Sequence, residues 1–344
     1  LFRSYKDMIQ QVKDGVNLLN ANNPAIDGDL FYDGDINKWK KFGGSLLLRI
    51  GMRLSEVAPD LAKQTVADAV TIGVMSQPED ICLLRHDGSG KNAFKNPLSF
   101  RYLDDNFIES DAVKIGKTFM DYLKKTKDPR IHVYCSLKDG NTEFDKQFGL
   151  PNGYDSHTIA DAPSGSFVGL ENTSNFNINT ILRLDAPTIF LMPSETKLLL
   201  AEAVLRNWTN GNAEVLYKEA ITSSMKEQEI AYGTQGKITD EEIETYLAQN
   251  LLSTANNTEK LQIIGEQYWV ATFINGYESY ANWRRTGYPK LIPTNYSGSM
   301  SPGVIPTRLP YPTDEYSINR ANVDTANQQQ GADKVTTHIW WDID

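Results

Sequence analysis

The sequence contains little cysteine, little histidine and no long hydrophobic run. Cys82 and Cys135 are the only cysteines among 344 residues, which excludes a disulfide framework and a four-cysteine metal site but leaves a single bridge open. The 4 histidines are scattered, with no pair at the spacing of zinc ligands. No segment approaches the roughly 18 consecutive apolar residues of a membrane-spanning helix. These absences argue against a metal-centred or membrane-embedded function.

Positive charge is also scarce, because 34 Lys and Arg residues face 44 Asp and Glu residues and give a formal net charge of −10. Nucleic acids and anionic membranes recruit Lys and Arg, so neither is expected to be the main partner. The negative net charge is compatible with a neutral ligand, a cation or a basic protein surface as the partner. With 40% hydrophobic and 10% aromatic residues, the chain has the composition of a folded globular protein.

The common enzyme motifs are missing. Ahead of Gly90 and Lys91, Arg85 stands where a phosphate-binding loop needs glycine, and Asn92 replaces its serine or threonine. The segment "GSFVG" at 165–169 has the wrong order for a hydrolase nucleophile elbow. The sequence therefore predicts no catalytic residues and no cofactor.

One acidic segment, "DGDLFYDGDIN", carries oxygen ligands at the spacing with which a calcium-binding loop begins. With Asp33 at the first position of such a loop, Lys38 occupies the place of the required glycine and Gly44 that of the bidentate glutamate. The segment is therefore no EF-hand, and we predict no metal site here. A looser calcium site and a solvated acidic loop both remain open.

Helical periodicity dominates the rest of the sequence. Residues 3–20 form a one-faced amphipathic pattern, and two helix pairs are expected at about 38–75 and 194–229. Both pairs carry small or apolar residues at spacings of three and four, as tetratricopeptide repeats do. These residues are Ala62, Val66 and Ala69 in the first pair, and Ala213, Tyr217 and Ala220 in the second.

Three further helices are predicted. One spans 110–125 with Ser110 as its N-cap, and one spans 240–252, where Thr239 and Glu242 form a capping box. The third and longest covers about 259–285 and is apolar around most of its circumference, which predicts a central, buried position.

Long irregular segments lie between these helices, at 76–109, 126–193 and 287–344. Loops of this length in a compact domain tend to be functional. No linker composition divides the chain. The prediction is a mainly α single domain, in which a helical scaffold supports a loop-built working surface.

The stretch "ESYANWRRTGYPKLIP" at 278–293 marks the end of the long helix. Arg284 and Arg285 fall in its last turn, Gly287 is placed to cap it, and Pro289 prevents its continuation. The buried stripe of this helix is expected to include Tyr277, Tyr280 and Trp283. We interpret the two arginines as a structural corner, with anion binding as the alternative.

Several segments resemble one protein family in the order in which that family carries them. They are "WKKFGGSLLLRIGMRLSEV", "DPRI" at 128–131, "SETKLLLAEAVLRNW", "EQYWVATFINGYESYANWRRTGYPKLIP" and "IPTRLPYPTDEYSINRANV". Together they resemble the SusD/RagB-like family, the nutrient-binding outer-membrane lipoproteins of Bacteroidetes. The resemblance covers nearly the whole chain.

Two departures from the family pattern stand out. The family carries an N-terminal part with a signal peptide and a lipidated cysteine before the point where this chain begins. Residues 1–344 are therefore expected to form one SusD/RagB-like domain without that part. Gly43 and Gly44 stand where the family favours Ala-Asn, and because glycine within a helix costs ~1 kcal/mol, a looser helix is predicted.

The resemblance implies a function without catalysis. A SusD/RagB-like protein is a surface-exposed outer-membrane lipoprotein that binds oligosaccharides and delivers them to a SusC-like TonB-dependent transporter. Its contact with the membrane would be an N-terminal lipid anchor that lies outside this chain. Two alternatives remain open, namely a peptide-binding member of the same family and a helical glycoside hydrolase.

Glycan sites place aromatic rings beside polar side chains, because sugars have apolar C–H faces and polar edges. The loop segments 91–107, 151–158 and 164–177 supply that mixture. The candidate glycan-binding residues are Tyr154, Asp155, Phe167, Asn172 and Phe176, with Phe94 and Asn106 as additions. Each aromatic residue among them could instead pack within its loop.

Overall fold

The computed structural model describes residues 2–20, 26–104, 113–154, 157–252, 256–294, 296 and 298–342. Within these ranges thirteen α-helices accompany four short β-strands, which confirms the predicted mainly α fold. The helices are α1 (Phe2–Leu18), α2 (Ile36–Arg53), α3 (Pro59–Ile72), α4 (Pro97–Asp104), α5 (Lys117–Thr126), α6 (Ile131–Tyr134), α7 (Pro193–Leu205), α8 (Ala213–Tyr232), α9 (Asp240–Gln249), α10 (Asn257–Ala271), α11 (Gly276–Thr286), α12 (Thr313–Ile318) and α13 (Arg320–Gln330). The strands are β1 (Cys82–Leu84), β2 (Cys135–Ser136), β3 (Asn175–Phe176) and β4 (Thr188–Leu191), with β1 antiparallel to β4 and β2 antiparallel to β3.

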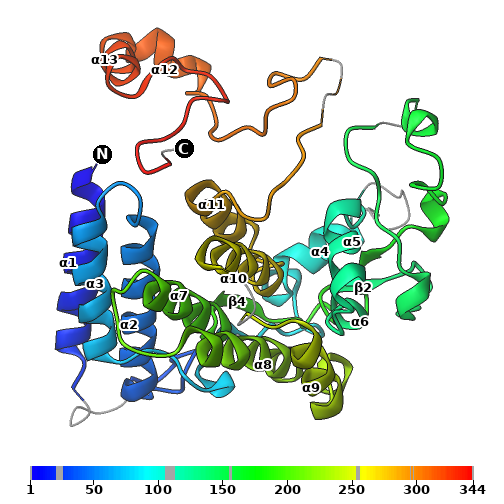
Figure 1. Cartoon of the computed structure of the whole chain (residues 1–344), viewed down its shortest axis with the longest axis horizontal. Coiled ribbons are helices and arrows are strands. Elements are labelled where there is room, and N and C mark those ends of the chain that lie inside the picture. Colours follow the sequence, from blue (N-terminus) through cyan, green and yellow to red (C-terminus); the bar gives the residue numbers. More distant parts are fainter. Residues whose placement is uncertain are drawn as a thin grey trace.

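The longer helices form a layered scaffold in the left, lower and central parts of Figure 1. Helices α1, α2 and α3 pack side by side, α7 packs on α8, and α10 lies against both α7 and α8. The small residues Ala62, Val66 and Ala69 of α3 and Ala220 of α8 are completely buried in these contacts. The two expected helix pairs with tetratricopeptide-like packing are therefore present. None of the described helices is long and apolar enough to cross a membrane.

Helix α2 approaches its neighbours so closely that it has no room for a side chain at two positions. A Cβ on Gly44 would lie 2.0 Å from the carbonyl oxygen of Gly73, and one on Gly43 would lie 2.3 Å from a methyl carbon of Val16. The sequence predicted a looser helix at these glycines. Instead, they allow α1 and the end of α3 to pack directly against α2.

Replacing Gly44 by alanine should destabilise the protein, because the new methyl group meets backbone that cannot rotate away. Overpacking of this kind costs about 1–3 kcal/mol. Gly15 of α1 is the control, since a Cβ there would have no neighbour within 4 Å. Gly15→Ala should be neutral or stabilising by up to ~1 kcal/mol. Urea denaturation measures both changes, and a Gly44→Ala variant as stable as the wild type would contradict the close approach.

A network of buried ion pairs joins α2 to α7 and α11. Arg49 Nε donates to Glu195 at 2.9 Å, and Arg53 Nη2 donates to Glu278 at 2.5 Å. Tyr268 of α10 donates its hydroxyl to the same Glu278 oxygen at 2.9 Å. Burial acts to raise the pKa of Glu278, but the guanidinium groups of Arg53 and Arg49 outweigh it and hold that pKa below its ordinary value. These side chains connect α2, α7, α10 and α11 in the interior.

Glu227 of α8 is buried without a guanidinium partner. Its carboxylate accepts hydrogen bonds from the backbone N–H of Ser194 at 2.8 Å and from the Ser194 hydroxyl at 2.6 Å. Burial raises the pKa of Glu227 to about 7, although both bonds from Ser194 oppose the rise. The folded protein therefore retains a proton that the unfolded chain has already released between pH 4.5 and about 7.

This carboxyl should make the free energy of unfolding fall as the pH rises from 4.5 to about 7. In Glu227→Gln that fall should shrink by ~2–3 kcal/mol, because each unit of pKa difference corresponds to about 1.4 kcal/mol. Urea denaturation of both proteins across this pH range measures the effect. The same pH dependence in variant and wild type would contradict it.

The predicted helix at 259–285 is wrong as a single element. α10 ends at Ala271, and α11 begins at Gly276 after a break in which Asn275 caps α11 by accepting from the N–H of Glu278 at 3.3 Å. Thr272 and Ser279 bond across the break at 2.7 Å. Tyr277, which was placed on the buried stripe, is 93% exposed because the break turns the start of α11 outward.

The helix predicted at 110–125 is shorter than expected. It begins at Lys117, and Ser110 lies outside the described residues. The backbone of Ile115 instead donates to Ser174 at 2.8 Å and accepts from Leu150 at 2.7 Å. These bonds hold residue 115 in an extended conformation and delay the helix. By contrast, the capping box of Thr239 and Glu242 at the start of α9 is confirmed.

The two cysteines are both buried and free, so the single bridge that the sequence left open is absent. Cys82 starts β1 and Cys135 starts β2, which belong to different two-stranded sheets.

Candidate functional site

A cleft opens where two of the loop-rich regions meet above the helical scaffold. Its volume is about 440 Å³, and we call it the loop cleft. Its floor comes from α5 and α10, one wall from Asn152, and the other wall from the described residues of the segment 291–306, which exclude 295 and 297. The lining residues are Gly116, Thr118, Phe119, Asn152, Trp269, Leu291, Ile292, Pro293, Thr294, Ser299, Ser301, Val304, Ile305 and Pro306.

The floor rests on a cluster of aromatic side chains. Trp269 meets Phe119 edge to face, with ring centroids 4.9 Å apart, and Phe119 stacks on Phe273 at 4.3 Å. Phe273 in turn contacts Phe176 at 5.5 Å. The Trp269 indole, half-buried at the edge of this cluster, is thereby held rigidly against the cleft.

The outer wall of the cleft is attached to α11. The hydroxyl of Tyr280 donates to the carbonyl of Pro306 at 2.7 Å, and Arg284 Nη1 donates to the carbonyl of Thr307 at 3.0 Å. The guanidinium of Arg284 lies 4.2 Å from the centre of the Tyr280 ring and 4.7 Å from that of Trp341. Consecutive turns of one helix thus position the end of segment 291–306.

Arg285 points the opposite way, into the scaffold. It donates to both carboxylate oxygens of Glu202 at 2.6 and 2.7 Å and to Ser55 at 3.1 Å, and Gly287 caps the helix in a left-handed conformation. The interpretation of these arginines as a structural corner is confirmed.

Removing the Tyr280 hydroxyl should loosen this wall. Tyr280→Phe keeps the ring beside Arg284 but loses the bond to Pro306, and a hydrogen bond contributes about 0.5–1.5 kcal/mol. We expect faster amide hydrogen exchange in residues 299–306 and little change in the scaffold helices. Tyr277→Phe, on the same helix but 93% exposed, is the matched control. Equal exchange in the two variants would contradict this role for Tyr280.

The structure distributes the sequence-predicted site residues among several places. Tyr154 is half-buried next to the loop cleft, since Asn152 lines it and a Cβ on Gly153 would lie 2.8 Å from Thr294 of the opposite wall. Asp155 and Asn106 lie outside the described residues. Phe176 belongs to the aromatic cluster beneath the cleft and contacts Tyr102 at 5.5 Å.

Three other candidates lie on separate turns. Phe94 is 58% exposed in a 3₁₀ turn at Asn92–Phe94. Asn172 is exposed, but its amide donates to the carbonyl of Val168 at 2.9 Å and thereby stabilises its own turn. Phe167 is half-buried in the segment just before.

Sequence reasoning missed several residues that line the loop cleft. Asn152 lies within a segment that had been singled out, whereas Trp269 fell within the long helix that was predicted to be central and buried. Thr118 and the polar residues of segment 291–306 carried no motif. The nearest sequence signal was the small and polar composition of "IPTNYSGSM" at 292–300.

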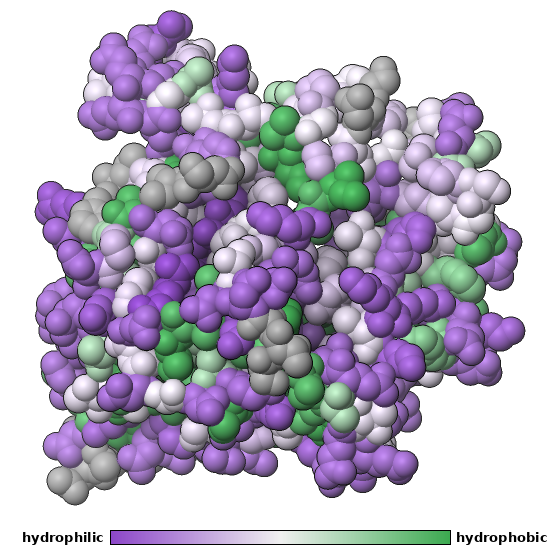
Figure 2. Space-filling model, in the orientation of Figure 1, coloured by the Kyte–Doolittle hydropathy of each residue, from purple (hydrophilic) through white to green (hydrophobic). Residues whose placement is uncertain are grey.

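The chemistry of the loop cleft is that of a neutral, partly polar surface. None of its lining residues carries a charge, and Asn152, Thr118, Thr294, Ser299 and Ser301 offer hydrogen-bonding groups beside the apolar ones. Figure 2 shows hydrophobic side chains gathered near the top of the molecule, where Figure 1 draws the orange loop. The arrangement suits a ligand with both apolar faces and hydroxyl or amide edges.

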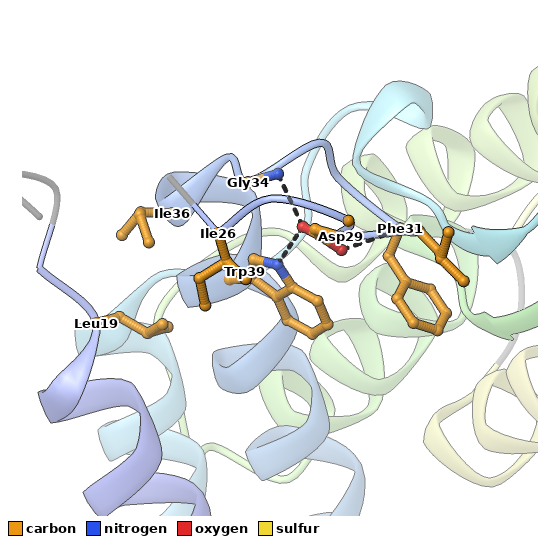
Figure 3. A pocket seen from close by; sticks show the side chains of 9 residues that line it. Leu19, Ile26, Asp29, Phe31, Gly34, Ile36 and Trp39 are labelled. Carbon is orange, nitrogen blue, oxygen red and sulfur yellow. Dashed lines mark hydrogen bonds between the residues drawn. The ribbon is translucent and has the colours of Figure 1, made fainter. Parts of the chain in front are cut away.

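A second pocket has different chemistry. It lies between the end of α1 and the start of α2, has a volume of about 380 Å³ and is lined mainly by aliphatic and aromatic side chains such as Ile26 and Trp39 (Figure 3). Asp29 is the only charged residue of its lining. The Asp29 carboxylate already accepts from Trp39 Nε1 at 2.7 Å and from the backbone N–H groups of Phe31 and Gly34, each at 2.9 Å. This pocket therefore offers a sugar few polar partners.

Comparison with known proteins decides the family. A family model described as "Starch-binding associating with outer membrane" matches residues 3–312. The chain belongs to the SusD-like family. The expected family membership is thereby confirmed over nearly the whole chain. A separate search of curated proteins finds no match.

Solved structures of SusD-like proteins share this fold. A chitin-binding protein is 31% identical, with a TM-score of 0.84, and the match covers 99% of this chain and 73% of that protein. A Bacteroidetes SusD-like protein is 25% identical, with a TM-score of 0.83 and coverage of 99% and 76%. A SusD homologue from Bacteroides uniformis is 25% identical, with a TM-score of 0.81 and coverage of 99% and 73%.

Proposed function

We propose that this SusD-like protein binds oligosaccharides in the loop cleft. The observation that carries the proposal is the combination of a fixed indole, Trp269, with uncharged polar side chains on both walls of one cleft. A sugar ring can lay its C–H face against apolar and aromatic surface while its hydroxyl groups bond to Asn152, Thr118 and Ser299. An uncharged lining favours a neutral glycan over a charged peptide.

The first glycan to test is an oligomer of N-acetylglucosamine. The structural relative that is 31% identical is named a chitin-binding protein, and chitin is a polymer of that sugar. The acetamido group adds one donor and one acceptor to the hydroxyl groups, and the Asn152 amide complements both. The match in chemistry supports this choice of ligand.

The proposed activity is binding without cleavage. Glycoside hydrolysis in most families needs two carboxyl groups on opposite sides of the scissile bond. The lining of the loop cleft includes no Asp or Glu. Incubation of the protein with chitohexaose should therefore release no shorter oligomer, and release of one would contradict this proposal.

The same proposal places the protein at the cell surface. The family's described association with the outer membrane supports a lipid-anchored protein that passes its ligand to a SusC-like TonB-dependent transporter. Co-purification with such a transporter from outer-membrane extracts, lost when the transporter gene is deleted, is the corresponding test.

Two single substitutions test the glycan site. Asn152→Ala removes a polar wall group and Tyr154→Ala removes the aromatic ring beside it; each should weaken chitohexaose affinity by about tenfold, which corresponds to 1.4 kcal/mol. Asn210→Ala, in the exposed turn between α7 and α8, is the control and should bind as the wild type does. Isothermal titration calorimetry measures the affinities. Unchanged affinity in both cleft variants would exclude the loop cleft, and binding of basic peptides in place of glycans would favour the peptide-binding alternative.

A further inference from the structure

A separate cleft lies at the opposite end of α5 from the loop cleft. Thr118, in the first turn of α5, lines the loop cleft, whereas Lys127, directly after its last residue, lines the second one. A ten-residue helix is about 15 Å long, so the two clefts are distinct but near. The second cleft has a volume of about 500 Å³, within the usual range of small-molecule sites, and we call it the α9 cleft.

One wall of the α9 cleft is a polar stripe on helix α9. Glu242, Thr245 and Gln249 line the cleft at spacings of three and four, which places them on one face of the helix. Thr245 and Gln249 are exposed, and in the described part of the chain their side chains have no hydrogen-bond partner. The stripe therefore presents an acceptor, a hydroxyl and an amide that a ligand can use.

Glu242 is held in position by the helix cap. Its Oε2 accepts from the backbone N–H of Thr239 at 2.8 Å and from the Thr239 hydroxyl at 2.7 Å. Its other carboxylate oxygen has no partner among the residues described. The cap thus orients Glu242 and leaves one oxygen as an acceptor toward the cleft.

The facing wall carries an aromatic ring. Phe144 is half-buried beside Thr142 and His132, and all three line the cleft opposite the stripe. Between the walls lies Tyr246, which is 2% exposed and whose hydroxyl accepts from Gln267 Nε2 at 2.7 Å. The floor is therefore fixed to α10 before a ligand arrives.

We propose that the α9 cleft is a second glycan-binding site, which takes a hydroxyl-rich sugar unit. The sugar's C–H face lies on Phe144, and its hydroxyl edge bonds to Glu242, Thr245 and Gln249. This inference rests on the proposed function in assuming a glycan ligand. A polymer with repeated units can occupy both clefts of one molecule, which raises its overall affinity above that of either cleft.

The test fills the α9 cleft with a side chain. Thr245→Trp places an indole in the cleft, whereas Glu244→Trp, at an exposed neighbouring position that does not line the cleft, is the matched control. Each is made alone and together with Asn152→Ala, and chitohexaose is titrated by calorimetry. Circular dichroism melting verifies that every variant folds.

Two binding sites per wild-type molecule are expected. Asn152→Ala should weaken one of them about tenfold and leave the other unchanged. Adding Thr245→Trp should weaken that other site at least about tenfold, whereas adding Glu244→Trp should not. A single site that Asn152→Ala removes completely would overturn the second cleft and leave the proposed function standing. Equal losses with Thr245→Trp and Glu244→Trp would also overturn it. No binding by the wild type of any glycan in a broad array would overturn both proposals.

Discussion

The ion pairs that α2 makes in the interior hold the whole arrangement together. Arg53 bonds to Glu278 at 2.5 Å, and Glu278 stands in the first turn of α11. A buried charge that loses its partner is strongly destabilising, by about 3–5 kcal/mol, so α11 cannot move away from α2 without a large penalty. Because α11 also carries Tyr280 and Arg284, which hold the outer wall of the loop cleft, the position of that wall depends on charges buried in the scaffold.

Local patterns predicted the helices well. The helix pairs, the capping box at Thr239 and the glycine cap at Gly287 all follow from residues within a few positions of each other. Two features were not predicted. Arg49 and Arg53 lie off the apolar stripe of α2, and nothing near them in the sequence indicates that they pair with Glu195 and Glu278, which lie far away in the chain. The Asn275-Gly276 pair is a turn signal that the continuous apolar pattern around it concealed.

The candidate site was harder to predict, because a cleft is built from segments that only folding brings together. Residue 152 meets residues 291–306 across α5 and α10, and no spacing in the chain indicates that meeting. Composition drew attention to the loop that contains Asn152 and Tyr154, and a role of Tyr154 in binding stays a prediction. Composition could not distinguish Phe176, whose ring supports the floor from below, from a ring that faces a ligand, since both are aromatic residues in polar loops.

The position of Trp341 makes distant parts of the chain depend on one another. Its indole lies over the guanidinium groups of both Arg53 and Arg284, with centroid distances of 5.4 and 4.7 Å. Trp340, its neighbour, packs edge to face on Tyr5 of α1. Two guanidinium groups that lie far apart in the sequence thus share one aromatic cover. Truncation of the segment after α13 would open both groups to water at once and would also remove the aromatic contact of α1.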